Sequence, residues 1–142
     1  METLKSLFNQ LQSQDAAVVN EANEQIRQYS ASRGIEILGD LSDVLLGDSM
    51  TIFQASQSII MMKNIIGSHT KQNIFEKKRV WSKFDDVLKN KIVTASIRGL
   101  MFDKDNIRNV AAVIVAEIFE ISLPNEFSFI QETLIELLND PK

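Results

Sequence analysis

The sequence predicts an all-α protein made of helical hairpins that stack side by side. Apolar residues recur at helical spacing along nearly the whole chain, which has 142 residues. Only two prolines and five glycines interrupt it, which suits long helices joined by short connections. Hydrophobic residues make up 44% and charged residues 24% of the chain, the balance of a folded domain rather than of a disordered one.

The helices are expected to form pairs. Their apolar stripes predict helices at 2–12, 16–30, 34–46, 51–66, a short one at 70–81, then 85–102, 106–121 and 125–139. The pairs span 2–30, 34–66 and 85–121, and helix 125–139 opens a fourth. A repeat of about 40 residues is typical of an α-solenoid, so we expect one domain over 1–142 with about three and a half hairpins. Apolar residues expected to be buried include Val18, Val19, Ala22, Ile26, Tyr29, Ile35, Val80 and Val87.

The stretch from Asp105 to Pro124 shows the helical pattern most clearly. Asp105 is expected to cap a helix, because its carboxylate can accept free backbone N–H groups and suits the positive end of the helix dipole. Apolar residues then follow on one face: Ile107, Val110, Ala111, Ile114, Ile118 and Ile121. Pro124 cannot continue this helix, but its fixed φ suits the first turn of the next one.

Helix 125–139 is apolar on more than one side. It carries Phe127, Phe129, Ile130, Leu134, Ile135, Leu137 and Leu138. Because the end of a solenoid normally shows a polar outer face, we expect the chain to be the N-terminal part of a longer solenoid. The alternative is a complete small helical bundle.

Charge and composition disfavour several classes of function. A net charge of −4 opposes sequence-independent binding to nucleic acid or to anionic membranes. There is no cysteine and only one histidine, His69, so neither a metal site nor a cofactor is expected. No apolar run approaches the roughly 20 residues that a membrane span needs, so membrane insertion is not expected.

Several short motifs occur in an order that resembles one family. Residues 105–111, which read DNIRNVA, resemble the HEAT-repeat signature, in which an Asp caps the second helix and an Arg follows a β-branched residue. Further short segments resemble successive parts of the importin-β N-terminal region. They are EQI at 24–26, KNII at 63–66, RVW at 79–81, and AEI and ISLP within 110–127. The resemblance covers the chain from Leu4 to Asn139. Three positions depart from the family pattern: Ala55, where arginine is usual, Phe127, where tryptophan is common, and Ser122, where glutamate is usual.

The resemblance implies a nuclear transport receptor rather than an enzyme. Its first repeats would bind the GTP-bound form of the small GTPase Ran and so regulate release of cargo or importin α during nuclear protein import. Importin α or cargo, and the nucleoporins, would bind through repeats beyond residue 142. The implied locations are the cytoplasm, the nucleus and the nuclear pore in the envelope. A HEAT scaffold of another kind (another importin, an exportin or a phosphatase-type adaptor) is the alternative. A helical-bundle enzyme would need a polar pocket that the sequence does not reveal.

The same resemblance indicates where the GTPase would bind. In that family the second helix of each pair lines the inner surface, which here means helices 16–30, 51–66 and 106–121. Polar residues off their apolar stripes are the candidate contacts: Asn20, Glu24, Arg27, Gln54, Gln57, Asn64, Asn109 and Glu120. Short polar side chains on rigid helices can hydrogen-bond a partner at low entropic cost. For Asn109 and Glu120 the alternative is a solvated face.

Lys63 is a ninth candidate of a different kind. The helical period places it nearer the apolar stripe than the polar one. It either contacts the GTPase or extends its stem along the helix, with the ammonium group near the helix C-terminus.

Overall fold

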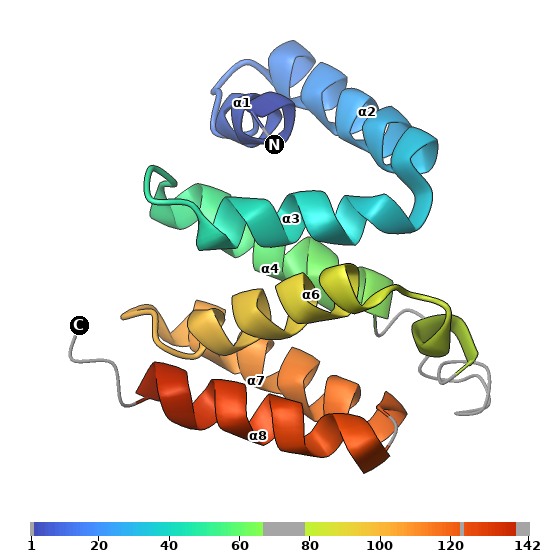
Figure 1. Cartoon of the computed structure of the whole chain (residues 1–142). Helices are drawn as coiled ribbons and strands as arrows, with labels where there is room; N and C mark the ends of the chain where they lie inside the picture. The colour runs from blue at the N-terminus through green and yellow to red at the C-terminus, as the bar shows by residue number, and fades with distance from the viewer. Residues whose placement is uncertain (1, 67–78, 123, 139–142) are drawn as a thin grey trace.

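The computed structural model describes residues 2–66, 79–122 and 124–138. Over these ranges the chain forms helices and turns without a β-strand, as the sequence predicts. With the labels of Figure 1, the elements are α1 (Glu2–Gln10), α2 (Ala16–Arg33), the 3-10 turn η1 (Gly34–Glu36), α3 (Ile37–Leu46), α4 (Ile52–Ile66), α6 (Asp86–Gly99), α7 (Asp105–Ile121) and α8 (Pro124–Leu138). Most of the predicted short helix at 70–81 lies outside the described residues, as does His69.

Helices α3, α4, α6, α7 and α8 stack in two layers. Figure 1 shows α3, α6 and α8 in one layer and α4 and α7 in the layer behind it. Within the layers α3 packs on α6, α6 on α8, and α4 on α7; between them α3 packs on α4 and α6 on α7. The first pair is placed differently, since α1 packs on α4 and α3 while α2 packs on α1 and η1.

Helix starts follow the sequence with one correction. The Asp15 carboxylate accepts a hydrogen bond from Ala17 N at 2.9 Å, and that of Asp85 from Leu88 N at 2.8 Å. Asp105, in contrast, is not the cap of α7. Lys104 holds that position, and Asp105 is already helical and forms an ion pair with Arg108 one turn on. Its charge still suits the helix N-terminus, although it makes no capping hydrogen bond there.

The core lies between the two layers and under α1. Phe8, Leu41, Ile59, Ile92 and Ile114 are fully buried within it. Several residues predicted to be buried are not. Tyr29 and Val19 are half-buried, and the following are exposed: Val18, Ile35, Val80 and Val87. Ile35 lies in the 3-10 turn rather than on a helical stripe, and Val87 is on the outer side of α6, so helical periodicity misplaced them.

Helix α8 buries some of its apolar residues and exposes others. Ile130 is buried, Leu134 is half-buried, and Ile135 is 59% exposed. The side chains of Phe127, Phe129, Leu137 and Leu138 lie outside the described set. One face of α8 therefore packs on α6, while Ile135 remains in contact with solvent.

Candidate partner-binding face

Helices α4 and α7 together present a continuous surface, which we call the α4–α7 face. The two helices pack against each other, and Asn106 Nδ2 of α7 donates to Ser56 Oγ of α4 at 3.5 Å at their junction. Both helices bury the side turned toward the other layer, so the opposite side of each is left toward solvent. The α4–α7 face consists of Ser56, Gln57, Ile60, Lys63, Asn64, Asn106, Asn109, Val113, Ala116 and Glu120.

Five of the predicted contact residues belong to this face. Asn64, Asn109 and Glu120 are exposed, and Gln57 and Lys63 are half-buried. None of these five side chains forms a hydrogen bond or an ion pair within the described part of the chain. Their polar groups are therefore available to a partner.

Gln54 does not belong to the face, which corrects its assignment as a contact residue. It is only 3% exposed. Its Nε2 donates to Lys5 O at 3.3 Å and to Asn9 Oδ1 at 3.0 Å, which ties α4 to α1. Its Oε1 accepts from Thr51 N at 2.9 Å while Gln54 N donates to Thr51 Oγ1 at 3.1 Å, a reciprocal capping box. The sequence signal was present, since Thr51 and Gln54 have the spacing of such a box.

The three candidates on α2 are separated from the others by the position of the first pair. Asn20 and Arg27 are exposed and Glu24 is half-buried. Glu24 accepts hydrogen bonds from Arg27 and from Gln28, and these bonds lower the pKa of its carboxyl group. Because α2 packs mainly on α1 and η1, these residues do not join the α4–α7 face.

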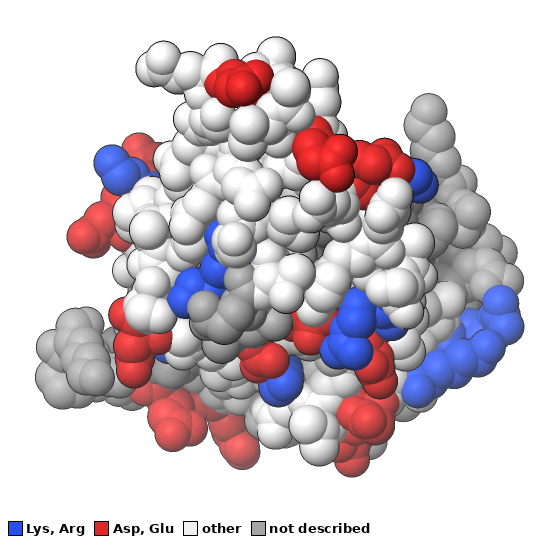
Figure 2. Space-filling view, turned by 90° about the horizontal axis from the view of Figure 1, so that it is seen from above, with Lys and Arg blue, Asp and Glu red and all other residues white. Residues whose placement is uncertain are grey.

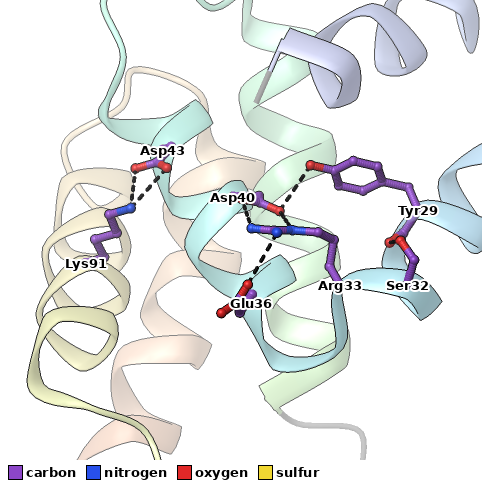
Figure 3. Close-up of polar contacts among 7 residues, drawn as sticks. All are labelled: Tyr29, Ser32, Arg33, Glu36, Asp40, Asp43 and Lys91. Carbon is purple, nitrogen blue, oxygen red and sulfur yellow. Dashed lines mark hydrogen bonds and ion pairs between the residues drawn. The ribbon is translucent and has the colours of Figure 1, made fainter.

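Sequence reasoning missed a polar cluster at the junction of α2 and α3. Arg33 Nε donates to Asp40 Oδ2 at 2.7 Å and Arg33 Nη2 to Asp40 Oδ1 at 3.0 Å, a bidentate pair (Figure 3). Tyr29 Oη donates to the same carboxylate at 3.2 Å, and Arg33 also pairs with Glu36 at 3.3 Å. The only signal in the sequence is that Tyr29, Arg33 and Asp40 flank Gly34, which does not reveal that their side chains meet.

Electrostatics favour an ionised Arg33–Asp40 pair in this cluster. Partial burial disfavours the Asp40 carboxylate, but hydrogen bonds from Arg33 and Tyr29 outweigh it, so the pKa of Asp40 lies below its usual value. Burial, together with the neighbouring Asp40 charge, raises the pKa of the Tyr29 hydroxyl. The cluster thus holds an ionised pair with a neutral tyrosine.

A groove of about 370 Å³ runs beside this cluster. Arg33, Glu36 and Asp40 line one side, and Lys83, Asp85 and Lys91 the other. Lys91 is paired with Asp43 at 3.1 Å. The lining holds three basic and three acidic groups, so the groove has no preference for one sign of charge. Figure 2 shows the same interspersion of both signs, among uncharged side chains, on the face seen from above.

Comparison of the chain with protein-family models, curated proteins and solved structures finds no match. Over the residues that the structure describes, no helix has the length and apolar character required to cross a bilayer. No group of three or more histidine, cysteine or acidic residues in those same ranges is arranged to hold a metal ion.

Proposed function

We propose that this chain is a HEAT-type α-solenoid segment that binds the GTP-bound form of Ran. In this proposal it acts in nuclear protein import, between the cytoplasm and the nucleus at the pore, and binding of Ran controls release of cargo or importin α. The sequence resemblance supplies the identity of the partner. The observation that carries the proposal is the α4–α7 face.

The composition of that face suits a protein partner. Asn64, Asn109 and Gln57 offer amide groups that can each donate and accept hydrogen bonds. Val113, which is 47% exposed, lies among them and provides apolar area at the centre of the α7 side. Because all of these residues project from packed helices, little backbone entropy is lost when a partner binds.

The mechanism is mechanical rather than chemical. Ran's switch segments are ordered when the γ-phosphate is present, so a rigid helical face can select that form by shape. While Ran is bound to the face, a cargo that needs the same curvature of the solenoid either cannot bind or binds under strain. Release follows from this competition, without any reaction on the chain itself.

The first pair departs from the stacking that the resemblance implies, because α1 rather than α2 packs on α4. This departure favours, as a second candidate, a HEAT scaffold of another kind, such as a different importin, an exportin or a phosphatase-type adaptor. In that case the same α4–α7 face would bind a protein other than Ran.

Substitution on the face tests the proposal. Asn109→Arg places a long charged side chain on the α7 side of the face, one turn before Val113, and should weaken Ran-GTP binding by at least about tenfold, the loss typical of a strong contact. The matched control is Asn90→Arg, since Asn90 is an exposed asparagine on α6 in the other layer. Equal affinities of the two variants would contradict the α4–α7 face as the binding surface.

A further inference from the structure

Helix α2 has little apolar contact to hold it in place. It is 18 residues long, yet it buries only Ala22 and Ile26, whereas the shorter α4 and α7 bury five residues each. It packs on α1 and on η1, and not extensively on the two layers. Packing alone therefore fixes its position weakly, since the hydrophobic contribution scales with the apolar area removed from water.

The polar cluster at its C-terminal end is the main connection of α2 to α3. Tyr29 and Arg33 come from the last two turns of α2, and both bind the carboxylate of Asp40, one turn into α3 (Figure 3). The Asp40 side chain is only 14% exposed, so its bonds to Arg33 are partly shielded from solvent. Bidentate arginine–carboxylate pairs are among the stronger and more directional polar contacts in proteins.

The turn between the two helices contains a glycine with a positive φ. Gly34 has φ of +62°, a conformation that other residues rarely adopt, and a side chain there would meet no atom within 4 Å. The space beside the Gly34 Cα is thus open to solvent rather than filled by a neighbouring side chain. Besides the packing of α2 on α1 and on η1, the contacts of Tyr29 and Arg33 with Asp40 hold the angle between α2 and α3.

We propose that Tyr29, Arg33 and Asp40 form a latch, and that α2 opens about the Gly34 turn when the latch is broken. Helix α1 stays in place, because Leu4, Leu7 and Phe8 are buried and Gln54 binds the backbone of Lys5. Since Arg33 and Asp40 also line the groove, a charged group of a bound partner can reach the latch directly.

Opening would move Asn20, Glu24 and Arg27 as one unit relative to the α4–α7 face. This consequence rests on the proposed function, because the resemblance also makes those three residues candidate contacts of the same partner. The latch itself does not, because it is a property of the isolated chain and can be measured without any partner.

Hydrogen exchange followed by mass spectrometry tests the latch through two matched substitutions. Asp40→Ala removes the carboxylate that holds α2, whereas Asp43→Ala removes a carboxylate on the same helix that binds Lys91 of α6 instead. In Asp40→Ala the amides in the C-terminal half of α2 should exchange about tenfold faster, as expected for local opening, with those of α3 and α4 unchanged. Asp43→Ala should leave α2 at the wild-type rate.

Two results would overturn the latch. One is unchanged exchange of α2 in Asp40→Ala; the other is equal acceleration of α2 and α3, which would mean that the two helices open as one unit. If Asp40→Ala does not fold, Arg33→Ala tests the same bond from the exposed side. The double substitution Arg33→Asp with Asp40→Arg should restore slow exchange, and failure to restore it would show that the pair itself is not what holds α2.

Discussion

Gly99 is the position where the packing of three helices leaves no room for a side chain. A Cβ atom there would lie 2.9 Å from Ala111 Cβ of α7 and 3.4 Å from Ile59 Cδ1 of α4. The first distance is shorter than real Cβ contacts, and Ala111 Cβ is attached directly to the helix backbone, so it cannot turn away. Gly99→Ala therefore requires α6 and α7 to move apart.

The loss of stability expected for Gly99→Ala follows from two opposing effects. Overpacking of this kind lowers the free energy of unfolding by about 1–3 kcal/mol. Alanine is a better helix former than glycine by up to about 1 kcal/mol in a helix interior, but Gly99 is the last residue of α6, so the compensation is small. We expect a net loss of about 1–2 kcal/mol and a melting temperature lower by roughly 4 °C per kcal/mol.

Gly39→Ala is the matched control for this prediction. Its Cβ would meet only Leu88 Cδ1, at 3.3 Å, which is the end of a flexible side chain that can adjust. Gly39 also lies inside α3, so alanine should change the free energy of unfolding by less than about 1 kcal/mol, in the stabilising direction or not at all. Denaturant unfolding of both variants compares them directly. A Gly99→Ala protein as stable as Gly39→Ala would refute the close approach of α6 and α7.

Three further predictions concern single side chains. Gln54→Ala removes the capping box and the tie to α1 and should lower the free energy of unfolding by about 1–3 kcal/mol in urea titrations, whereas half-buried Gln57→Ala should change it by less than about 0.5 kcal/mol. Because the pKa of Asp40 in the folded protein lies below its ordinary value of 3.8, the ionised carboxylate stabilises the fold above that pH, and this stabilisation is lost as the pH falls through the lower pKa of the folded state. The stability difference between wild type and Asp40→Asn should thus be constant from neutral pH to about pH 5 and shrink on further acidification, and a growing difference would contradict the assignment. Ile114→Ala, at a fully buried site, should lower the free energy of unfolding measured by calorimetry by about 2–5 kcal/mol. Val113→Ala, on the exposed side of α7, should change it little. Similar losses in the two variants would mean that the wrong side of α7 is described as buried.

Helical periodicity in the sequence predicted much of the fold. Of the predicted stripe, Val110 is half-buried and the other members are buried, because a single strong period over about four turns leaves one orientation for the helix: Ile107, Ala111, Ile114, Ile118 and Ile121. The helical character of the chain was predicted for the same reason. Helix ends were less accurate, since helix boundaries shift easily by one or two residues: α7 begins at Asp105 itself, and Lys104 before it makes no side-chain capping bond.

Residues whose role depends on a distant element were not predictable from the sequence. The capping box of Gln54 is signalled by its spacing to Thr51, but the bonds of its side chain to Lys5 and Asn9 depend on the placement of α1. The exposure of Val18 likewise depends on where α2 lies relative to the two layers. The Asp40 cluster was missed because it needs the turn at Gly34, and local sequence does not specify the angle of that turn.

The binding of Ran in its two nucleotide states tests the central proposal most directly. The chain would be titrated by calorimetry with Ran loaded with a non-hydrolysable GTP analogue and, separately, with GDP. The proposal predicts binding to the GTP form at least about tenfold tighter than to the GDP form, a difference of about 1.4 kcal/mol. Equal binding to both forms, or no binding to either, would contradict it.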